Sequence, residues 1–394
     1  MTPIFLSEMS ALPLLGGGVT LNKIIGKQIT SFSAFIKCYH NPSQALPNYP
    51  NGISVCLPYP KNSSIFTKLL GCRISHFVNR SRIIRSLYAR RIAFHSLHAL
   101  NNSLPSSRFL VCPNSEFSLD VFEQIYRRYS NEYITWVMDD HMVRWTRSGW
   151  MYPKNIESKF SLHLKNARLV YVISEAMAQF YKEKFDVESH VLHAPCESLP
   201  VDEPRDQLKT KGPCRLVYFG SLGRWQNDAI EGLVPHILDK TCELNIFTRN
   251  LAQIPDSLRN LPSVLVHNPI DSNDICKVSR NFDAMVLPIS FKEELKNMSF
   301  FNIATKFSDC IGAPIPTILI GPSDSIMMKT AKKYEAFASV ESLDFSAMNE
   351  ALQKLSNPNV RAAMLAGRRL AFKEMCGVDV MATRWKPAAD FLFN

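Results

Sequence analysis

The sequence predicts an α/β protein built from two Rossmann-like domains that face each other across a cleft. Short apolar runs alternate with amphipathic segments along both halves of the chain, as in parallel sheets covered by helices. The 394 residues also exceed what one core usually holds. Residues 195–213, rich in proline and charge, read as a linker. We therefore expect an N-terminal domain at 1–195, a C-terminal domain at 196–378 and a closing helix at 379–394.

Apolar runs without polar alternation predict the buried strands of the first half, at residues 4–6, 53–57, 109–112, 133–138 and 169–173. Gly17 and Gly18 belong to a glycine triplet at a predicted helix start, where backbone can approach a ligand closely. Arginines crowd residues 80–91 but scatter around the expected helix axis. They indicate a basic surface region and no amphipathic membrane helix.

Asp139, Asp140 and His141 follow the predicted strand at 133–138. The carboxyl ends of parallel strands are where open α/β sheets bind ligands. A histidine that is oriented by neighbouring carboxylates can act as a general base. A helix-capping aspartate with a surface histidine is an equally weighted alternative.

The second half predicts strands at 216–219, 244–247, 263–267, 283–288 and 317–322. Glycines at 220 and 223 end the first of these, and a helix is expected to begin near Ala229. A strand, glycine turn and helix start point backbone N–H groups at an anion, and Arg224 could grip phosphate oxygens there. An ordinary βα turn with a solvated arginine is the alternative.

Charge is unevenly distributed along the chain. Residues 1–200 hold 22 Lys and Arg against 13 Asp and Glu, and the rest hold 23 against 22, within a net charge of +10. The basic half suggests an anionic partner such as a lipid surface, although surplus cations also keep proteins soluble.

No apolar run approaches the ~18 residues of a membrane helix, and no basic segment precedes the first apolar residues. The ten cysteines form no CxxC pair, which makes a zinc site improbable. We expect a cytoplasmic protein that could associate peripherally with the inner face of a membrane.

Four stretches follow one another along the chain in this order: SEMSALPLLGGGVTL, YVISEAMAQFYKEKF, YFGSLGRW and ATKFSDCIGAPIPTILIGP. Together they resemble the GT-B glycosyltransferases of the nucleotide-sugar-dependent family 4-like group. The resemblance implies the GT-B fold, with the final helix packed back on the first domain. It also implies transfer of a sugar from a nucleoside-diphosphate donor to a saccharide or lipid-linked acceptor.

The resemblance assigns roles residue by residue. Gly17 and Gly18 would lie against the donor phosphate or the transferred sugar, and Arg224 and Lys306 would contact the diphosphate. Thr305 precedes that lysine in the family's Thr-Lys segment, and Asp309 stands where relatives carry a glutamate that binds the ribose. By position alone, Thr248 and Asn268 would contact the base. Two departures stand out: Phe301 replaces a glutamate, and Gln226 and Asn227 stand where a lysine is common.

With Arg224 and Lys306 supplying positive charge and no DxD motif present, we expect metal-independent transfer with no cofactor beyond the sugar nucleotide. Asp139, Asp140 or His141 could act as base in an inverting mechanism or orient the acceptor in a retaining one. Phe301 leaves open a catalytically silent protein that binds a sugar nucleotide or glycan. A nicotinamide oxidoreductase lacks its GxGxxG signature here, and a nucleic-acid binder lacks a recognisable motif.

Overall fold

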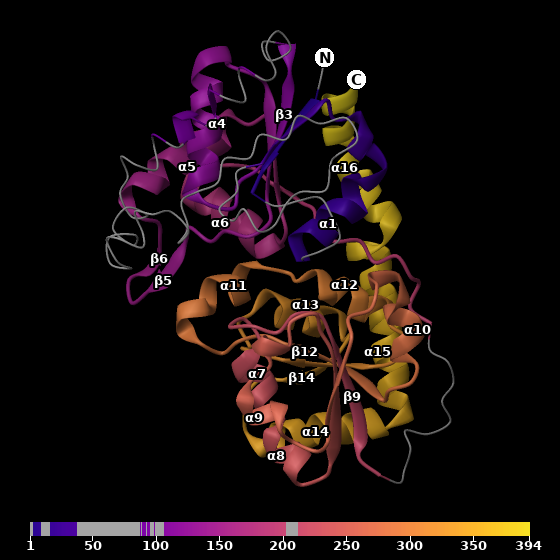
Figure 1. Ribbon diagram of the computed structural model, residues 1–394. Coiled ribbons are helices and arrows are strands. Elements are labelled where there is room, and N and C mark those ends of the chain that lie inside the picture. The colour runs from indigo at the N-terminus through magenta and orange to yellow at the C-terminus, as the bar shows by residue number, and fades with distance from the viewer. Residues whose placement is uncertain are drawn as a thin grey trace. The chain divides into compact units, whose positions relative to one another are not determined.

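The chain forms two compact units, each organised around one parallel six-stranded sheet (Figure 1). The computed structural model describes residues 3–8, 16–37, 87, 89–91, 93–94, 98, 106–201 and 212–394. The first unit comprises Met1–Leu192 with Thr383–Asn394, and the second comprises His193–Ala382. The strand expected at 53–57 and most of the arginine-rich segment at 80–91 lie outside the described residues.

The sheet of the first unit has the strand order β2-β1-β3-β4-β7-β8, and all its neighbouring strands pair in parallel. Its members are β1 (Pro3–Ser7), β2 (Ala34–Lys37), β3 (Arg108–Cys112), β4 (Tyr133–Val137), β7 (Leu169–Val172) and β8 (His190–Val191). The expected strands at 4–6, 109–112, 133–138 and 169–173 are thus confirmed. Every residue of β1 and β4 is buried, which explains their unbroken apolar sequence.

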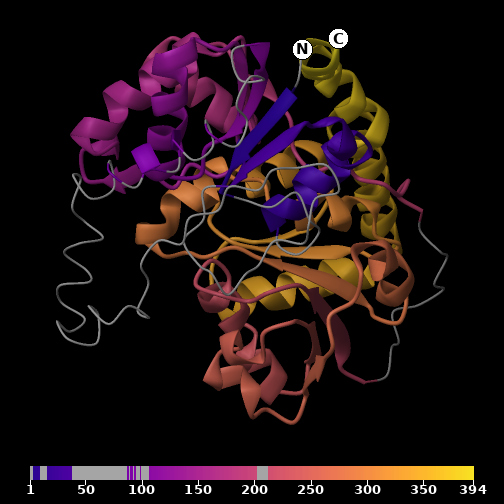
Figure 2. The same cartoon turned by 45° about the horizontal axis from the view of Figure 1, so that its top comes forward.

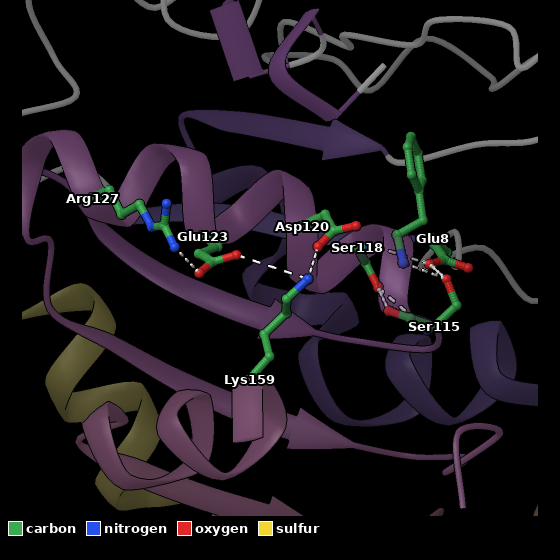
Figure 3. Close-up of polar contacts among 8 residues, drawn as sticks. Glu8, Ser115, Ser118, Asp120, Glu123, Arg127 and Lys159 are labelled. Carbon is green, nitrogen blue, oxygen red and sulfur yellow. Dashed lines mark hydrogen bonds and ion pairs between the residues drawn. The ribbon is translucent and has the colours of Figure 1, made fainter. Parts of the chain in front are cut away.

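Helices and a small hairpin complete the first unit. They are α1 (Gly16–Ile25), η1 (Gly26–Ser31), α4 (Glu116–Tyr129), β5 (Arg144–Thr146), β6 (Gly149–Met151), α5 (Lys154–Asn166) and α6 (Glu175–Phe185). Lys159 of α5 pairs with Asp120 of α4 and lies 3.9 Å from Glu123, which also pairs with Arg127 at 2.7 Å (Figure 3). This ion-pair network joins α4 to α5 on the outside of the sheet.

The end of α16 (Val378–Phe393) packs on the first unit. Trp385 Nε1 donates to Gln28 Oε1 at 2.8 Å, and the rings of Phe393 and Phe32 meet edge to face at 5.2 Å. Figure 2 shows this part of α16 beside the α1–η1 segment. The final twelve residues therefore share the core of the first unit although they end the chain.

The sheet of the second unit has the order β11-β10-β9-β12-β13-β14, again entirely parallel. Its strands are β9 (Cys214–Phe219), β10 (Cys242–Phe247), β11 (Val264–His267), β12 (Ala284–Pro288), β13 (Thr317–Ile320) and β14 (Ala338–Val340). The five strands expected here are confirmed. Because the order reverses between β9 and β12, loops following these strands meet at a topological switch point.

Short and long helices alternate with these strands. They are α7 (Asn227–Glu231), α8 (Val234–Leu238), η3 (Leu251–Gln253), α9 (Asp256–Arg259), η4 (Ser272–Asp274), α10 (Ile275–Ser279), η5 (Glu293–Leu295), α11 (Lys296–Phe301), α12 (Thr305–Gly312), α13 (Ile326–Tyr334), α14 (Phe345–Ser356), α15 (Pro358–Ala371) and the π-helical η6 (Phe372–Cys376). No helix in the described ranges is long and apolar enough to span a membrane.

The second unit begins earlier than a linker at 195–213 would suggest. Ser308 Oγ donates to the Ala194 carbonyl at 2.6 Å, and Cys196 N donates to the Cys376 carbonyl at 2.6 Å. Ala194 and Cys196 are both buried. These residues anchor the start of the segment in the second unit, so the boundary between the units lies between Leu192 and His193, before the expected linker.

Candidate functional site

The turn after β9 has a backbone that only glycine fits well. Gly220 has φ of +114°, and its N–H donates to the Phe247 carbonyl at 2.8 Å. A Cβ added at Gly220 would lie 2.3 Å from Lys306 Cε and 2.7 Å from Lys306 Nζ. The glycine therefore satisfies the turn geometry and leaves room for the lysine side chain.

Lys306 is held against this turn by a chain of hydrogen bonds. Its Nζ donates to the Tyr218 hydroxyl at 2.7 Å, and that hydroxyl donates to the Ser221 carbonyl at 2.8 Å. The ammonium is half-buried, and it belongs to the first turn of α12. A positive charge is thus fixed where β9 ends and α12 begins, a place where the helix dipole also favours an anion.

Arg224 extends from the same turn and is exposed. Its guanidinium carbon lies 4.3 Å from the ring centroid of Trp225. The turn itself is fixed to the end of β12, because Ser290 N donates to the Trp225 carbonyl at 2.9 Å and Phe291 N donates to Asp228 Oδ2 at 2.7 Å. The backbone below Arg224 is therefore anchored while its charged end faces solvent.

Thr305 and Asp309 lie on the same helix as Lys306, and both are half-buried. Four residues apart, they occupy one face of α12 on successive turns. Phe301, where the family resemblance implies a glutamate, is buried at the end of α11 and packs edge to face on Phe300 at 5.0 Å. That position contributes an apolar ring to the core and no carboxylate.

Thr248 and Asn268, the expected base contacts, follow β10 and β11 of the second sheet. Thr248 is 2% exposed, and its hydroxyl accepts from Asn250 N at 3.4 Å, so it stabilises the turn after β10. Asn268 is exposed, but it follows β11 at the edge of the sheet, two strands from β9. Two strand spacings place the end of β11 about 10 Å from the end of β9, so the base contact at Asn268 stays a prediction, and the hydrogen bond of Thr248 gives that residue a structural role.

In the first unit, Gly17 and Gly18 lie in the first turn of α1, so the expected helix start is confirmed. Glu8 is a residue that the motif analysis overlooked. Its Oε1 accepts from the Ser115 hydroxyl and from Ser118 N at 3.2 Å (Figure 3). Its carboxylate thus occupies the N-terminus of α4, and no anionic ligand is needed to satisfy that helix end.

Asp140 is a structural residue, which corrects the catalytic role expected for it. The side chain is 2% exposed, and Oδ1 accepts from Met142 N at 3.0 Å and Val143 N at 3.1 Å. Oδ2 accepts from the hydroxyls of Tyr152 at 2.5 Å and Tyr181 at 2.8 Å. Burial raises the pKa of Asp140, opposed by these hydrogen bonds. With four donors on one buried carboxylate, this side chain organises the loop after β4.

Asp139 and His141 differ from Asp140 in accessibility. Asp139 is half-buried and His141 is exposed, and His141 N donates to the Asp139 carbonyl at 3.1 Å. Burial raises the pKa of the Asp139 carboxyl, and the nearby imidazole of His141 opposes this shift. A reachable carboxylate with a raised pKa has the properties of a general base. No cluster of three or more potential metal ligands occurs among the described side chains.

Comparison with solved structures identifies the fold over the whole chain. Sucrose-phosphate synthase from Thermosynechococcus elongatus is 16% identical with a TM-score of 0.65, covering 100% of this chain and 99% of its own. HepE from Anabaena, solved with UDP, is 10% identical with a TM-score of 0.64, covering 100% of both chains. An α,α-trehalose-phosphate synthase from Burkholderia xenovorans, solved with glucose-6-phosphate, is 10% identical with a TM-score of 0.57, covering 100% of both.

These structures are GT-B glycosyltransferases, and the chain has the GT-B fold. Neither a family model nor a curated protein matches the sequence. At such low identity the likeness extends to the arrangement of strands and helices. The roles of individual residues must therefore be argued from their own contacts.

Proposed function

We propose that this chain is a glycosyltransferase that moves a sugar from a nucleoside-diphosphate donor to a saccharide or lipid-linked acceptor. The observation that carries the proposal is the Lys306 ammonium fixed against the Gly220 turn at the carboxyl edge of the second sheet. HepE, which shares the fold, binds UDP and UDP-glucose in solved structures. We assign donor binding to the second unit and acceptor binding to the first.

The chemistry requires stabilisation of a departing diphosphate. The bond between the anomeric carbon and the diphosphate oxygen breaks, and its electron pair stays on that oxygen. Lys306, Arg224 and the N-terminus of α12 would meet the growing negative charge with preorganised positive charge. Two side-chain cations make metal-independent transfer the simplest mechanism, with no cofactor besides the sugar nucleotide. Asp309 would hold the ribose hydroxyls, and Thr305 would help orient the start of α12.

At the acceptor, a hydroxyl oxygen forms the new bond to the anomeric carbon and gives up its proton. We propose Asp139 as the group that accepts this proton or orients the hydroxyl, with His141 as its electrostatic partner. Gly17 and Gly18, which open α1, would allow backbone to approach the transferred sugar. With inversion, Asp139 would accept the proton; with retention, Asp139 would orient the hydroxyl and the departing diphosphate oxygen would accept the proton.

Activity of Lys306→Ala with the donor found in a screen of sugar nucleotides tests the proposal. A lost contact to developing charge typically costs ~3–4 kcal/mol of transition-state stabilisation, so kcat/KM should fall roughly a hundredfold or more. The melting temperature should stay close to wild type. Lys333→Ala is the matched control, because this exposed lysine also lies near a tyrosine ring, 5.1 Å from the centroid of Tyr334. Equal activity of the two variants would refute the assigned site.

A catalytically silent protein that binds a sugar nucleotide or glycan is the second candidate. The buried Phe301 favours it, because the carboxylate of related enzymes is absent at this position. Donor binding without transfer or donor hydrolysis, measured with the same sugar nucleotides, would support this alternative. A thermal shift reports binding in either case, since a bound ligand stabilises the folded state by mass action.

We further propose a cytoplasmic protein that meets an anionic membrane surface on its inner face, where a lipid-linked acceptor would lie. The excess of 22 Lys and Arg over 13 Asp and Glu in residues 1–200 supports an anionic partner. Nucleic acid is not proposed as a partner, because the sequence carries no motif for its recognition.

A further inference from the structure

The antiparallel hairpin formed by β5 and β6 carries a pair of tryptophans. Trp145 pairs directly with Trp150 across the strands, and their rings meet edge to face with centroids 4.8 Å apart. The Trp150 ring also lies 6.3 Å from the ring of Phe180 on α6. Gly149, with φ of +101°, begins β6 directly after the two-residue turn and pairs with Thr146. Aromatic packing on both strands therefore gives the hairpin a defined position on the first unit.

The same hairpin concentrates positive charge. Arg144, Arg147 and Lys154 are exposed, and in the described part of the chain none of them forms an ion pair. The sequence contains no acidic residue from 141 to 156. The next one, Glu157, is paired with Lys184 at 2.8 Å. We define these three cations with the two tryptophans as the hairpin patch; Figure 1 shows β5 and β6 at one corner of the first unit.

We propose that the hairpin patch is the element that docks this protein on a membrane rich in anionic lipid headgroups. Its cations lie on β5, in the turn after β5 and at the start of α5, so they present charge to a surface. Met151, which pairs with Arg144, is 49% exposed and adds an apolar side chain beside the charge. Tryptophan prefers the boundary between headgroups and acyl chains, and arginine and lysine reach anionic headgroups on flexible apolar stems.

Charge complementarity favours this occupant over a neutral saccharide. A neutral sugar could stack on the tryptophan rings, but it would leave three exposed cations without a counterpart. Anionic headgroups match the cations, and the membrane interface matches the tryptophans and Met151. The biological role of docking rests on the proposed function, since docking would bring the first unit to a lipid-linked acceptor. Docking itself is measured without any donor.

Sedimentation of the full chain with phosphatidylcholine vesicles, with and without phosphatidylglycerol, tests the proposal. The hairpin variant Arg144→Gln, Arg147→Gln, Lys154→Gln loses three positive charges. The matched variant Arg128→Gln, Lys165→Gln, Arg168→Gln loses the same charge from exposed positions on α4, on α5 and before β7. At about fivefold per lost cation, the hairpin variant should bind phosphatidylglycerol vesicles roughly a hundredfold more weakly than wild type. The matched variant should lose far less, and added salt should weaken wild-type binding.

Equal losses in the two triple variants would overturn the proposal, as would wild-type binding that does not depend on phosphatidylglycerol. A second measurement uses quenching of tryptophan emission by lipids brominated in the acyl chain. Wild type should be quenched, and the Trp145→Phe, Trp150→Phe variant should lose that quenching, because Trp136 and Trp385 are buried and Trp225, the fifth tryptophan, lies in the turn after β9 of the second unit and outside the hairpin patch. Quenching that persists in this variant would place the contact elsewhere. A thermal shift with UDP tests the donor site separately, so failure of either proposal can be recognised independently of the other.

Discussion

Gly220 is the residue on which the geometry of the donor turn depends most directly. Gly220→Ala places a Cβ on a backbone with φ of +114° and within 2.3 Å of Lys306 Cε. The flexible lysine end would have to move, and the strained backbone would cost about 1–3 kcal/mol. We expect a lower melting temperature together with at least a tenfold weaker binding of UDP, measured by calorimetry.

Gly223→Ala in the same turn is the control for this prediction. A Cβ added at Gly223 meets no atom within 4 Å. It should therefore change neither stability nor UDP binding by much. If Gly220→Ala bound UDP as wild type does, the position of Lys306 would be irrelevant to the donor.

Asp139 and Asp140 are neighbours with opposite expected responses to the same substitution. Asp140→Asn removes a carboxylate that accepts two backbone and two tyrosine hydrogen bonds in a buried position. Leaving buried donors unsatisfied should lower the free energy of unfolding by about 3 kcal/mol. Asp139→Asn should leave stability nearly unchanged while it lowers kcat about a hundredfold or more, as expected for a lost general base.

Thermal denaturation and initial-rate kinetics on the two variants separate these roles. A stable Asp140→Asn protein with impaired turnover would indicate that Asp140 takes part in catalysis. Normal turnover in Asp139→Asn would remove Asp139 from the mechanism. In that case the acceptor proton would have to be taken up by another group.

At the scale of elements, the sequence predicts strands well where burial is complete and the apolar run is long. β4 and β12 have every residue buried, and both were predicted. β2 and β14 were not predicted. β14 has three residues, too few to establish a periodic pattern, and the two strands exist because they pair with β1 and β13. The β5–β6 hairpin was missed for the same reason.

In the candidate site, too, local patterns could be read from the sequence and long-range contacts could not. Glycine turns and the Thr-Lys segment are local patterns, so Gly220, Arg224 and Lys306 could be found from the sequence alone. The hydrogen bond from Lys306 to Tyr218 joins residues 88 positions apart. The contact between Glu8 and Ser115 spans 107 positions. No local pattern encodes such contacts, so the positioning role of Tyr218 and the capping role of Glu8 appear only in the folded chain.

At the scale of the whole molecule, the fold is shared far more widely than the sequence. Similar structures cover nearly the whole chain at 16% identity or less. What such chains share is the order of buried strands and helices, which depends on apolar patterning and tolerates most substitutions. Phe301 illustrates the consequence, because a buried aromatic ring fits the fold at a position where the family resemblance implies a glutamate.

The pH dependence of stability should report on the core of the first unit through His163. This side chain is buried, and its Nε2 lies 3.0 Å from the Thr135 hydroxyl. That hydroxyl donates to the Val111 carbonyl at 3.1 Å, so Nε2 must carry a hydrogen and donate to the hydroxyl oxygen. Burial lowers the pKa of His163 from 6.5 to about 3.

Below pH 6.5 His163 becomes protonated in the unfolded chain, whereas in the folded chain it stays neutral until about pH 3. The free energy of unfolding should therefore fall as the pH drops through this window, by about 2 kcal/mol at pH 5 relative to neutral pH. His163→Gln keeps an N–H donor for Thr135 but cannot titrate. Chemical denaturation gives the free energy of unfolding at pH 5 and at pH 7.5. The difference between these two values should be about 2 kcal/mol smaller in this variant than in wild type. His190→Gln, at an exposed position of β8, is the control and should preserve the wild-type difference. An unchanged difference in His163→Gln would mean that other groups carry the acid sensitivity of the first unit.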